Sequence, residues 1–486
     1  MKSENVENND IKMAKKTSFI IIFLYCISVV LFYFLAGQQL IFRESRGNIE
    51  ELIPNSASIE MQTGSLITQT FTNDIQILDK IIIDFGDYKR KNDGVVNVKL
   101  VDEAQNRILI DQNIEQSEIK EGTKTEFYLS EPSEENYGHK MSIIIQGISG
   151  ESGSVITPLM NTKENEDSRK QLFFNNKEVQ GTICFEVQGR DRIWFGMHYW
   201  KFVLAGFVLV MAYCGMLNYR VKNNKKVLLF NVIFSLSKYK FLINQMVSRD
   251  FKTKYKRSVL GIFWSFLNPL LQMLVQYIVF SNLFKQDIPY YHVYLIIGVV
   301  MFNFFSEACG MTLSSILGNA HLMTKVYVPK YIYPLVRVSS SAINLLIALI
   351  PLLLITLFSG IVFTKAIVLI IFALICLIIF SFGLGLVLAT SMVFFRDTQF
   401  LWGVISMMWM YLTPIFYPIS IIPDKLAIII KSNPLYYYID FIRMCIIDGV
   451  SPEPIAYFNC IFSAIIMLFI GSYIFKKNED KFIFYL

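Results

Sequence analysis

The sequence predicts an all-α membrane protein of about eight transmembrane helices, with an all-β domain inserted outside the membrane. Of its 486 residues, 53% are hydrophobic and only 17% are charged, which is too apolar for a soluble protein of this length. Apolar runs that approach or exceed the length of a bilayer span recur along the chain, and a stretch between the first two alternates polar and apolar residues as β-strands do. The runs are Phe19–Ala36, Phe202–Leu217, Val259–Phe284, Tyr294–Leu317, Pro334–Phe363, Ala366–Phe394, Phe400–Tyr417 and Ile455–Phe475.

The distribution of charge predicts which side of the membrane each part faces. Gln38–His198 holds 26 acidic and 17 basic residues, whereas the rest of the chain holds 13 acidic and 28 basic residues. Because cytoplasmic loops are enriched in Lys and Arg, the acidic stretch is expected to be extracytoplasmic and both termini cytoplasmic. The first run follows Lys12, Lys15 and Lys16 but is longer than the core of a signal peptide, so we expect an uncleaved anchor in the cytoplasmic membrane.

These patterns divide the chain into five parts. The predicted parts are a cytoplasmic N-terminus with its anchor (1–37), the β domain (38–198), a second transmembrane helix with a basic cytoplasmic linker (199–224), an amphipathic interface helix (225–258) and a six-helix membrane core with re-entrant outer helices (259–486).

The β domain is predicted to be an antiparallel sandwich or jelly roll. Segments such as "GSLITQTFT", "DGVVNVKLVDE" and "KMSIIIQGIS" alternate with period two and are separated by Asn, Asp, Gly and Pro turns. Its aromatic residues fit a hydrophobic core, and they also fit stacking on sugar rings. Tyr88, which stands beside three basic residues at a strand end, is the candidate for sugar stacking.

A basic stretch stands directly before the third apolar run. In "SRDFKTKYKRSVLGIFWSFLNPLL" (Ser248–Leu271), apolar residues recur every three or four positions. This spacing predicts a helix that lies in the membrane interface and continues without a loop into the span, as one rigid lever. Pro269 should kink the span near its start. The cations expected to meet a lipid phosphate are Arg249, Lys252, Lys254, Lys256 and Arg257.

Four motifs in this half of the chain resemble the permease subunits of type-2 ABC exporters, in the branch that exports O-antigen and teichoic acid chains. The resemblance covers about Lys225–Leu486, and the two added spans and the β domain depart from the usual six-span pattern. It implies a homodimer that moves a lipid-linked polysaccharide. The motifs are the basic stretch above, "NAHLMTKVYVPKYIYPL" (Asn319–Leu335), "FFRDTQFLWGVISMMWMYLTPIFYP" (Phe394–Pro418) and "NPLYYYIDFIRMCIIDG" (Asn433–Gly449).

The chain contains no Gly-Lys dipeptide, so it has no Walker loop to hold nucleotide phosphates. ATP with magnesium is therefore expected on a partner, and the resemblance implies two copies of a separate ATPase subunit. That subunit would grip a short basic loop between two spans, although positive-inside loops are basic in any case. The candidate coupling residues are Gly318, Asn319, Leu322, Lys325 and Pro329.

Polar residues at helical spacing in two spans are candidates for a channel wall that offers hydrogen bonds and ring faces to sugars. Hydrogen-bonded packing between helices, and the preference of Trp and Tyr for membrane interfaces, are the alternatives. The candidates are Trp264, Asn268, Gln272 and Gln276 in one span, and Trp402, Ser406, Trp409, Thr413 and Tyr417 in another, where Gln399 shares the face.

Glu307 and Asn303 lie inside an apolar run, where a carboxylate is functional by default. Glu307 would face the cavity, pair with a cation such as Arg396, or stay protonated. Between Pro418 and Pro454, apolar pieces too short to span predict re-entrant outer helices, where the resemblance implies a gate. The four histidines are scattered, so no metal site is expected.

The predicted function is a channel for a lipid-linked surface polysaccharide such as O-antigen or teichoic acid, driven by a partner ATPase and not itself an enzyme. Nucleic acid is not an expected partner. Export of a drug or small lipid on the same fold, and a chain-length or assembly scaffold, remain as alternatives. The β domain would bind the polymer or serve as a spacer above the exit.

Overall fold

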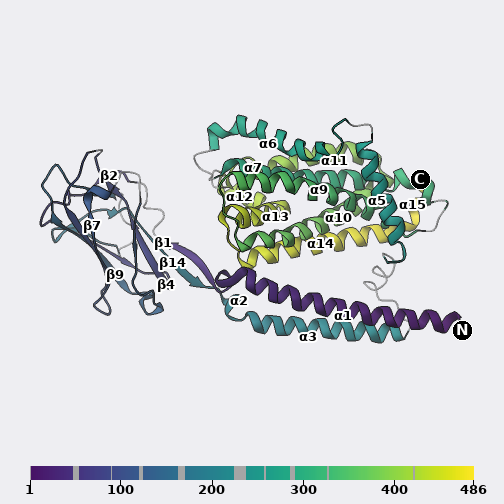
Figure 1. Ribbon diagram of the computed structural model, residues 1–486, viewed down its shortest axis with the longest axis horizontal. Coiled ribbons are helices and arrows are strands. Elements are labelled where there is room, and N and C mark those ends of the chain that lie inside the picture. Colours follow the sequence, from purple (N-terminus) through teal and green to yellow (C-terminus); the bar gives the residue numbers. More distant parts are fainter. Residues whose placement is uncertain are drawn as a thin grey trace. The chain divides into compact units, whose positions relative to one another are not determined.

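The computed structural model comprises two compact units, which are described separately below (Figure 1). The membrane unit consists of Met1–Leu40 and Tyr199–Leu486, and the β unit consists of Ile41–His198. The structure describes residues 2–47, 54–88, 90–119, 124–162, 170–223, 237–256, 259–284, 290–323, 325, 328–419 and 422–485.

The β unit contains three antiparallel sheets. One has the strand order β1-β14-β4-β8, the second β13-β10-β2 with β5 also paired to β10, and the third β12-β11-β3-β9-β6-β7. The strands are β1 (Phe42–Gly47), β2 (Ser56–Ala57), β3 (Leu66–Thr72), β4 (Ile77–Ile83), β5 (Phe85–Gly86), β6 (Val95–Asp102), β7 (Arg107–Glu115), β8 (Thr125–Tyr128), β9 (Lys140–Ser149), β10 (Thr157–Asn161), β11 (Leu172–Phe174), β12 (Lys177–Val179), β13 (Thr182–Ile183) and β14 (Phe185–Arg192).

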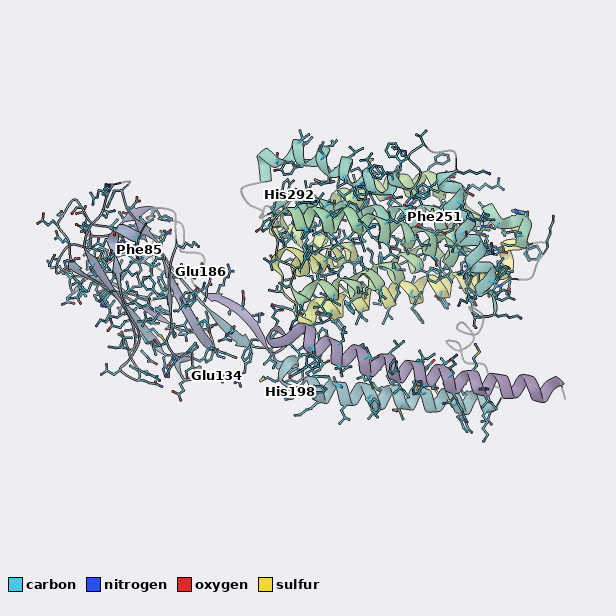
Figure 2. The ribbon with its side chains drawn as sticks, viewed as in Figure 1. Phe85, Glu134, Glu186, His198, Phe251 and His292 are labelled. Carbon is cyan, nitrogen blue, oxygen red and sulfur yellow. The ribbon has the colours of Figure 1, made fainter. Side chains whose placement is uncertain are left out.

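The predicted strands all lie in these sheets, and their inward residues form one core. Phe71, Phe85 and Phe127 have no exposed surface, so these aromatic residues belong to the core and cannot stack on a sugar. Figure 2 shows the side chain of Phe85 within the β unit, with Glu186 of β14 nearby in the view. The sequence patterns missed β1, β2 and β10 to β12, which are short or contain several charged residues.

Within the described residues, seven helices are long and apolar enough to cross a membrane. They match seven of the eight predicted runs. These helices are α1 (Lys2–Ala36), α3 (Tyr199–Lys222), α6 (Phe263–Phe284), α7 (Tyr291–Leu313), α9 (Ile332–Phe358), α10 (Ile370–Phe394, preceded by a 3-10 turn) and α14 (Pro454–Asn478).

The eighth predicted span, Phe400–Tyr417, differs from the expectation. Its helix, α11 (Thr398–Leu412), has 15 residues and is therefore about 22 Å long at 1.5 Å per residue. A transmembrane helix needs about 20 residues. Pro414 and Pro418 follow at once, and neither can donate a backbone hydrogen bond, so the chain leaves the helix before it reaches a full span.

The interface helix and the third span are also separate elements, which corrects the prediction of one rigid lever. Helix α5 ends at Tyr255 (Lys240–Tyr255) and α6 begins at Phe263. Between them Gly261 adopts φ +51°, a left-handed conformation that a helix interior excludes and that glycine tolerates without strain. The described part of the junction therefore contains a turn, and motion of α5 need not be transmitted rigidly to α6.

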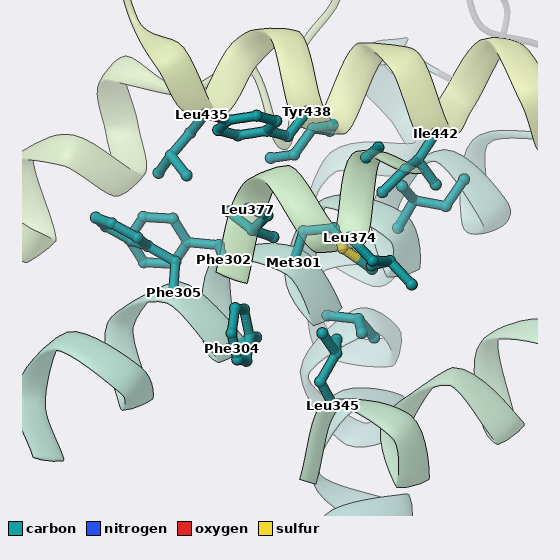
Figure 3. Close-up of a cluster of buried hydrophobic side chains, with 14 of the residues drawn as sticks. Met301, Phe302, Phe304, Phe305, Leu345, Leu374, Leu377, Leu435, Tyr438 and Ile442 are labelled. Atoms are coloured by element: carbon teal, nitrogen blue, oxygen red, sulfur yellow. The ribbon is translucent and has the colours of Figure 1, made fainter. Parts of the chain in front are cut away.

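The helices of the membrane unit pack around α7. Its buried residues Met301 and Phe305 belong to the same hydrophobic cluster as Leu377 of α10 and Tyr438 of α13 (Pro434–Arg443), and Figure 3 shows part of this cluster. Helices α10 and α14 approach backbone to backbone, since a Cβ added to Gly471 would stand 2.0 Å from the carbonyl oxygen of Gly383. Such small-residue contacts let helices associate in lipid, where the burial of apolar surface alone contributes little free energy to association.

Helices α1 and α3, which precede and follow the β unit in the chain, pack against each other in antiparallel directions. The Tyr25 hydroxyl donates to the carbonyl of Val203 at 2.7 Å, and the Tyr199 hydroxyl donates to the carbonyl of Val29 at 2.8 Å. Phe32 of α1 meets Tyr457 of α14 edge to face, with ring centroids 5.0 Å apart. This pair of helices thus contacts the other helices near one of its ends.

Candidate functional site

A cleft of about 350 Å³ opens where α5, α6, α7 and α9 meet. Its walls mix aromatic surface with amide, hydroxyl and charged groups, the combination that ligand sites in proteins commonly use. The polar lining residues are Lys254, Tyr255, Ser265, Asn268, Asn303, Glu307, Ser341 and Asn344, and Trp264 supplies an indole.

An ion pair anchors the network in this cleft. Lys254 of α5 contacts Glu307 of α7 with 2.8 Å between Nζ and Oε1, and the Asn344 amide donates to the same oxygen at 2.6 Å. The Tyr255 hydroxyl donates to Asn344 Oδ1 at 3.0 Å and also bonds Ser265 of α6. Of the three possibilities for Glu307, the structure therefore shows a cavity-facing carboxylate paired with a cation, and that cation is Lys254 instead of Arg396.

Tyr255 is the residue that gathers these groups. Its ring packs edge to face on Phe251, one turn earlier in α5, with centroids 5.0 Å apart; Figure 2 labels Phe251. Because its hydroxyl reaches both α6 and α9, the end of the interface helix is held in the cleft on two sides. Partners of this kind reduce the cost of placing polar groups near hydrocarbon.

The four candidates on α6 divide between the cleft and the neighbouring helix. Trp264 and Asn268 line the cleft, and Trp264 is 47% exposed. Gln272 donates weakly to Asn268 at 3.4 Å and accepts a 2.7 Å bond from Asn303 of α7. Gln276 is further along, and its buried Oε1 has no hydrogen-bond partner among the described residues. The amide series thus serves both as a wall and as a seam between helices.

The cations of α5 differ in what they contact. The carboxylate of Asp250, which is only 8% exposed, forms ion pairs with Arg249 at 3.1 Å and with Arg337 of α9 at 2.8 Å. Lys254 is paired with Glu307. Lys252 and Lys256 are exposed and make no ion pair within the described part of the chain. Arg257 lies outside the described residues. Two of the predicted phosphate-binding cations are thus available to a ligand.

The candidate coupling residues form a compact connection between α7 and α9. The connection contains a 3-10 turn (Leu317–Asn319) and α8 (Ala320–Met323). Asn319 is buried and its amide donates to the Ser315 carbonyl at 2.8 Å, whereas Gly318 and Lys325 are exposed. Leu322 packs against a hydrophobic cluster shared with α5, α9 and α10. Pro329 is partly buried just before α9.

The candidate face of α11 is packed inside this chain. Trp402 and Ser406 are 7% and 8% exposed, and Ser406 shares a 3.1 Å hydrogen bond with Ser306 of α7. Trp409 donates from Nε1 to Asn433 at 2.8 Å, and the Asn433 amide donates to Thr413 at 2.8 Å. Tyr417 donates to the carbonyl of Tyr411 at 2.6 Å. These residues do not line the cleft, and their role in a channel wall stays a prediction.

A buried arginine holds the chain that follows α11. Arg443, 5% exposed, donates to the carbonyls of Pro414 at 2.8 Å and Ile415 at 3.2 Å. Its guanidinium carbon also lies 3.3 Å from the ring centroid of Tyr294. Backbone carbonyls outside a helix need such donors when no water is present. The predicted outer pieces are short helices, α12 (Asp424–Lys431) and α13, followed by a π-helix (Met444–Asp448).

In the β unit, the sugar-stacking candidate has one face already occupied. Tyr88 is 48% exposed, but the guanidinium carbon of Arg90 lies 4.6 Å from its ring centroid. Arg90 in turn bonds Glu60 at 2.7 Å. A larger polar cavity, of about 590 Å³, lies elsewhere on this unit, on strands β6, β7 and β9.

Sequence reasoning did not single out four residues that complete the cleft and the ion pair of Asp250. These residues are Tyr255, Ser265, Arg337 and Asn344. An amide inside an apolar span was the available signal for Asn344, by the same argument that identified Glu307. No group of three His, Cys, Asp or Glu residues that could hold a metal lies within the described ranges.

The part of the chain that contains the cleft is similar to known proteins. The model of the ABC-2 type transporter family matches residues 242–447, from α5 to the π-helix. The O-antigen export system permease protein RfbA of Klebsiella pneumoniae is 32% identical over 247 residues, which are 50% of this chain and 93% of that protein. RfbA of Myxococcus xanthus is 27% identical over 256 residues (52% and 98%), and the polysialic acid transport protein KpsM of Escherichia coli is 22% identical over 244 residues (50% and 95%).

These similarities and the helical membrane unit define a transporter membrane subunit. The chain belongs to the ABC-2 type transporter family. About half of the chain lies outside the part that these relatives match, since the matched part is 50% to 52% of its length.

Proposed function

We propose that this chain is the channel-forming permease of an ATP-driven exporter that moves a lipid-linked cell-surface polysaccharide across the cytoplasmic membrane. The observation that carries the proposal is the similarity to O-antigen permeases over 93% or more of their length. The amide- and hydroxyl-rich cleft supports it, because sugar hydroxyls both donate and accept hydrogen bonds. O-antigen fits the names of these relatives more directly than teichoic acid does.

The lipid phosphate of the substrate would be met by Lys252 in the last turn of α5 and Lys256 directly after it, which are exposed and have no ion pair in the described chain. Lys254 and Glu307 form a neutral pair, so the cleft itself suits the uncharged part of the polymer. Phosphate contacts by Lys are strong because both groups are charged. Substituting Lys252 and Lys256 together by Gln should therefore impair export without impairing membrane insertion.

Energy would come from a separate ABC ATPase, two copies of which would dock on a homodimer of this chain. The connection around α8, with exposed Gly318 and Lys325, is the proposed docking element. Its base is packed on α5 and α9, so a push on the connection would reach the cleft. Both termini would lie in the cytoplasm and the β unit outside, which requires that α11 and the residues directly after it cross the membrane together, in addition to the seven longer helices.

The test is deletion of the gene, followed by fractionation of lipid-linked glycan. Accumulation of undecaprenyl-linked glycan inside the cell, with loss of surface polysaccharide, is expected. Unchanged surface glycan would refute polysaccharide export and favour a drug or small lipid as the substrate. The purified chain should hydrolyse no ATP alone, and the partner ATPase should restore ATP-dependent transport in proteoliposomes.

A further inference from the structure

The polar cavity of the β unit lies on the outer face of its six-stranded sheet. On β6, Val96, Val98 and Leu100 point into the core, so Asn97 and Lys99 point to the opposite face. The register sets Gln146 of β9 and Asn113 of β7 on either side of Asn97, and Asp111 of β7 beside Lys99. Side chains directly opposite on neighbouring strands are close enough to act together. The residues lining the cavity are Thr63, Gly64, Asn97, Lys99, Asp111, Asn113, Gln146, Gly147 and Ile148.

One buried amide sets the orientation of the cluster. Asn97 is 7% exposed, and its Nδ2 donates to Asp111 Oδ1 and to Asn113 Oδ1, both at 2.7 Å. Its own Oδ1 accepts no hydrogen bond from the described residues. A buried acceptor without a donor is costly, and native proteins rarely tolerate one without a reason. That oxygen has almost no exposed surface, so the groups open to a ligand are the exposed amides of Asn113 and Gln146 and the Lys99–Asp111 pair.

The charge of the cluster restricts the ligand. Lys99 Nζ lies 3.1 Å from Asp111 Oδ2, so the two charges balance. The Asn97 amide and then Lys99 lower the pKa of Asp111, which keeps that carboxylate ionised and accepting. Among the described residues no further charged group lines the cavity, so this lining offers no net attraction to an anion such as phosphate or nucleic acid.

We propose that this face of the β unit is a binding site for an uncharged, hydroxyl-rich glycan, held by Asn113, Gln146 and the Lys99–Asp111 pair, with Asn97 positioning Asn113 and Asp111. A hydroxyl can donate to a carboxylate or amide oxygen and accept from an amide or ammonium, and it needs no charge partner. The cavity of about 590 Å³ falls within the range of ligand sites in proteins, roughly 300 to 1,000 Å³. That this glycan is the polymer being exported rests on the proposed function.

The proposed site is distinct from the stacking role predicted for Tyr88. Tyr88 does not line this cavity, and the lining contains no aromatic ring. Recognition would come from hydrogen bonds to hydroxyl groups, with Ile148 as the apolar contact for a sugar's C–H face. Such polar contacts make specificity sensitive to which hydroxyl groups the sugar carries, because an unpaired polar group in the site costs binding free energy.

The experiment uses the full-length chain in nanodiscs and isothermal titration calorimetry. The probes are the host's own surface polysaccharide, released from its lipid by mild acid, and dextran as an unrelated neutral polymer. We expect the host polysaccharide to bind and Asn113→Ala/Gln146→Ala to weaken its binding at least tenfold. The matched control, Gln105→Ala/Gln112→Ala, removes two exposed amides that do not line the cavity and should bind like the parent chain.

Two results would overturn the site: no binding of either polymer by the parent chain, or equal binding by Asn113→Ala/Gln146→Ala. Raising NaCl from about 0.1 to 1 M, which shortens the Debye length from about 10 to 3 Å, should leave affinity within twofold; a steep loss would indicate an anionic ligand and refute the proposal. Binding in vitro with unchanged surface glycan after gene deletion would preserve the site and refute the export function. Loss of surface glycan after gene deletion, without binding in vitro, would support the export function and refute the site.

Discussion

Lys254 of α5 and Glu307 of α7 meet with 2.8 Å between Nζ and Oε1, so the interface helix is tied by an ion pair to a transmembrane helix. We predict that Glu307→Gln slows export while the protein still reaches the membrane, since Lys254 then lacks its counter-charge beside the cleft. Surface glycan per unit of permease measures the effect. The double variant Lys254→Gln/Glu307→Gln should recover part of it, with a coupling free energy of about 1 kcal/mol, as for partly exposed pairs. Additive effects of the two substitutions would contradict a functional link.

Asp250 is the second junction between α5 and α9. Its carboxylate is buried and accepts from Arg337 at 2.8 Å, so Asp250→Asn leaves a partly buried guanidinium without compensation. We expect a loss of about 2 kcal/mol in stability, less than for a fully buried pair because Arg337 keeps some exposure. Thermal unfolding in detergent checks this. Arg249→Gln, at the more exposed cation, is the control and should cost under about 1 kcal/mol.

Arg443 should be essential for the order of the segment after α11. Its fork donates to the carbonyls of Pro414 and Ile415, and a lysine cannot reproduce that fork. We predict faster hydrogen exchange at the described residues 413–419 in both Arg443→Lys and Arg443→Met, because the carbonyls lose their donors. Lys431→Gln, at a cation in the last turn of α12, serves as the control. Unchanged exchange in Arg443→Met would show that packing alone holds the segment.

In the β unit, burial raises the pKa of Asp84, although Lys124 and the backbone N–H of Phe85 oppose the rise. A carboxyl whose pKa is higher in the folded state stabilises the fold below its unfolded pKa of about 3.9, and this contribution is lost as the pH rises through the folded value. Asp84→Asn should therefore raise the unfolding temperature of the β unit at pH 7 and change little at pH 3.5. Hydrogen exchange of strands β4 and β5 with temperature measures it.

The pKa of Glu60 is shifted in the opposite direction to that of Asp84. Hydrogen bonds from Arg90, then Gly153 and Ser152, lower the pKa of its carboxyl. Such a group stabilises the fold above its unfolded pKa and stops doing so as the pH falls through the folded value. We expect Glu60→Gln to destabilise at pH 7 and to have less effect in acid. If both variants shifted stability in the same direction at pH 7, the electrostatic assignment would be wrong.

Elements with a strong local period were predictable from the sequence. Seven spans and the longer strands follow directly from runs of apolar residues and from alternation, since each pattern suits one backbone geometry. The errors fall where a local breaker competes with the pattern. Pro414 and Pro418 shorten α11, and Gly261 separates α5 from α6, although the hydrophobic pattern continues through both places.

The candidate site was predictable only as single helix faces. Trp264 and Asn268 are four residues apart on α6, so their joint place in the cleft follows from helical spacing. Their neighbours could not be found this way, because Lys254, Glu307 and Asn344 come from three other helices. The same holds for Arg443, whose partners Tyr294 and Pro414 are far away in the chain.

By itself the sequence determined that the chain enters a membrane, that residues 38–198 form strands, and that no Gly-Lys dipeptide is present to bind nucleotide. These properties depend on composition and on near neighbours. The tertiary structure alone decided that Glu307 pairs with Lys254, that the α11 face is packed inside the chain, and that Asn97, Asn113 and Gln146 share one cavity. Those relationships depend on which helices and strands lie side by side, and packing between distant segments sets that arrangement.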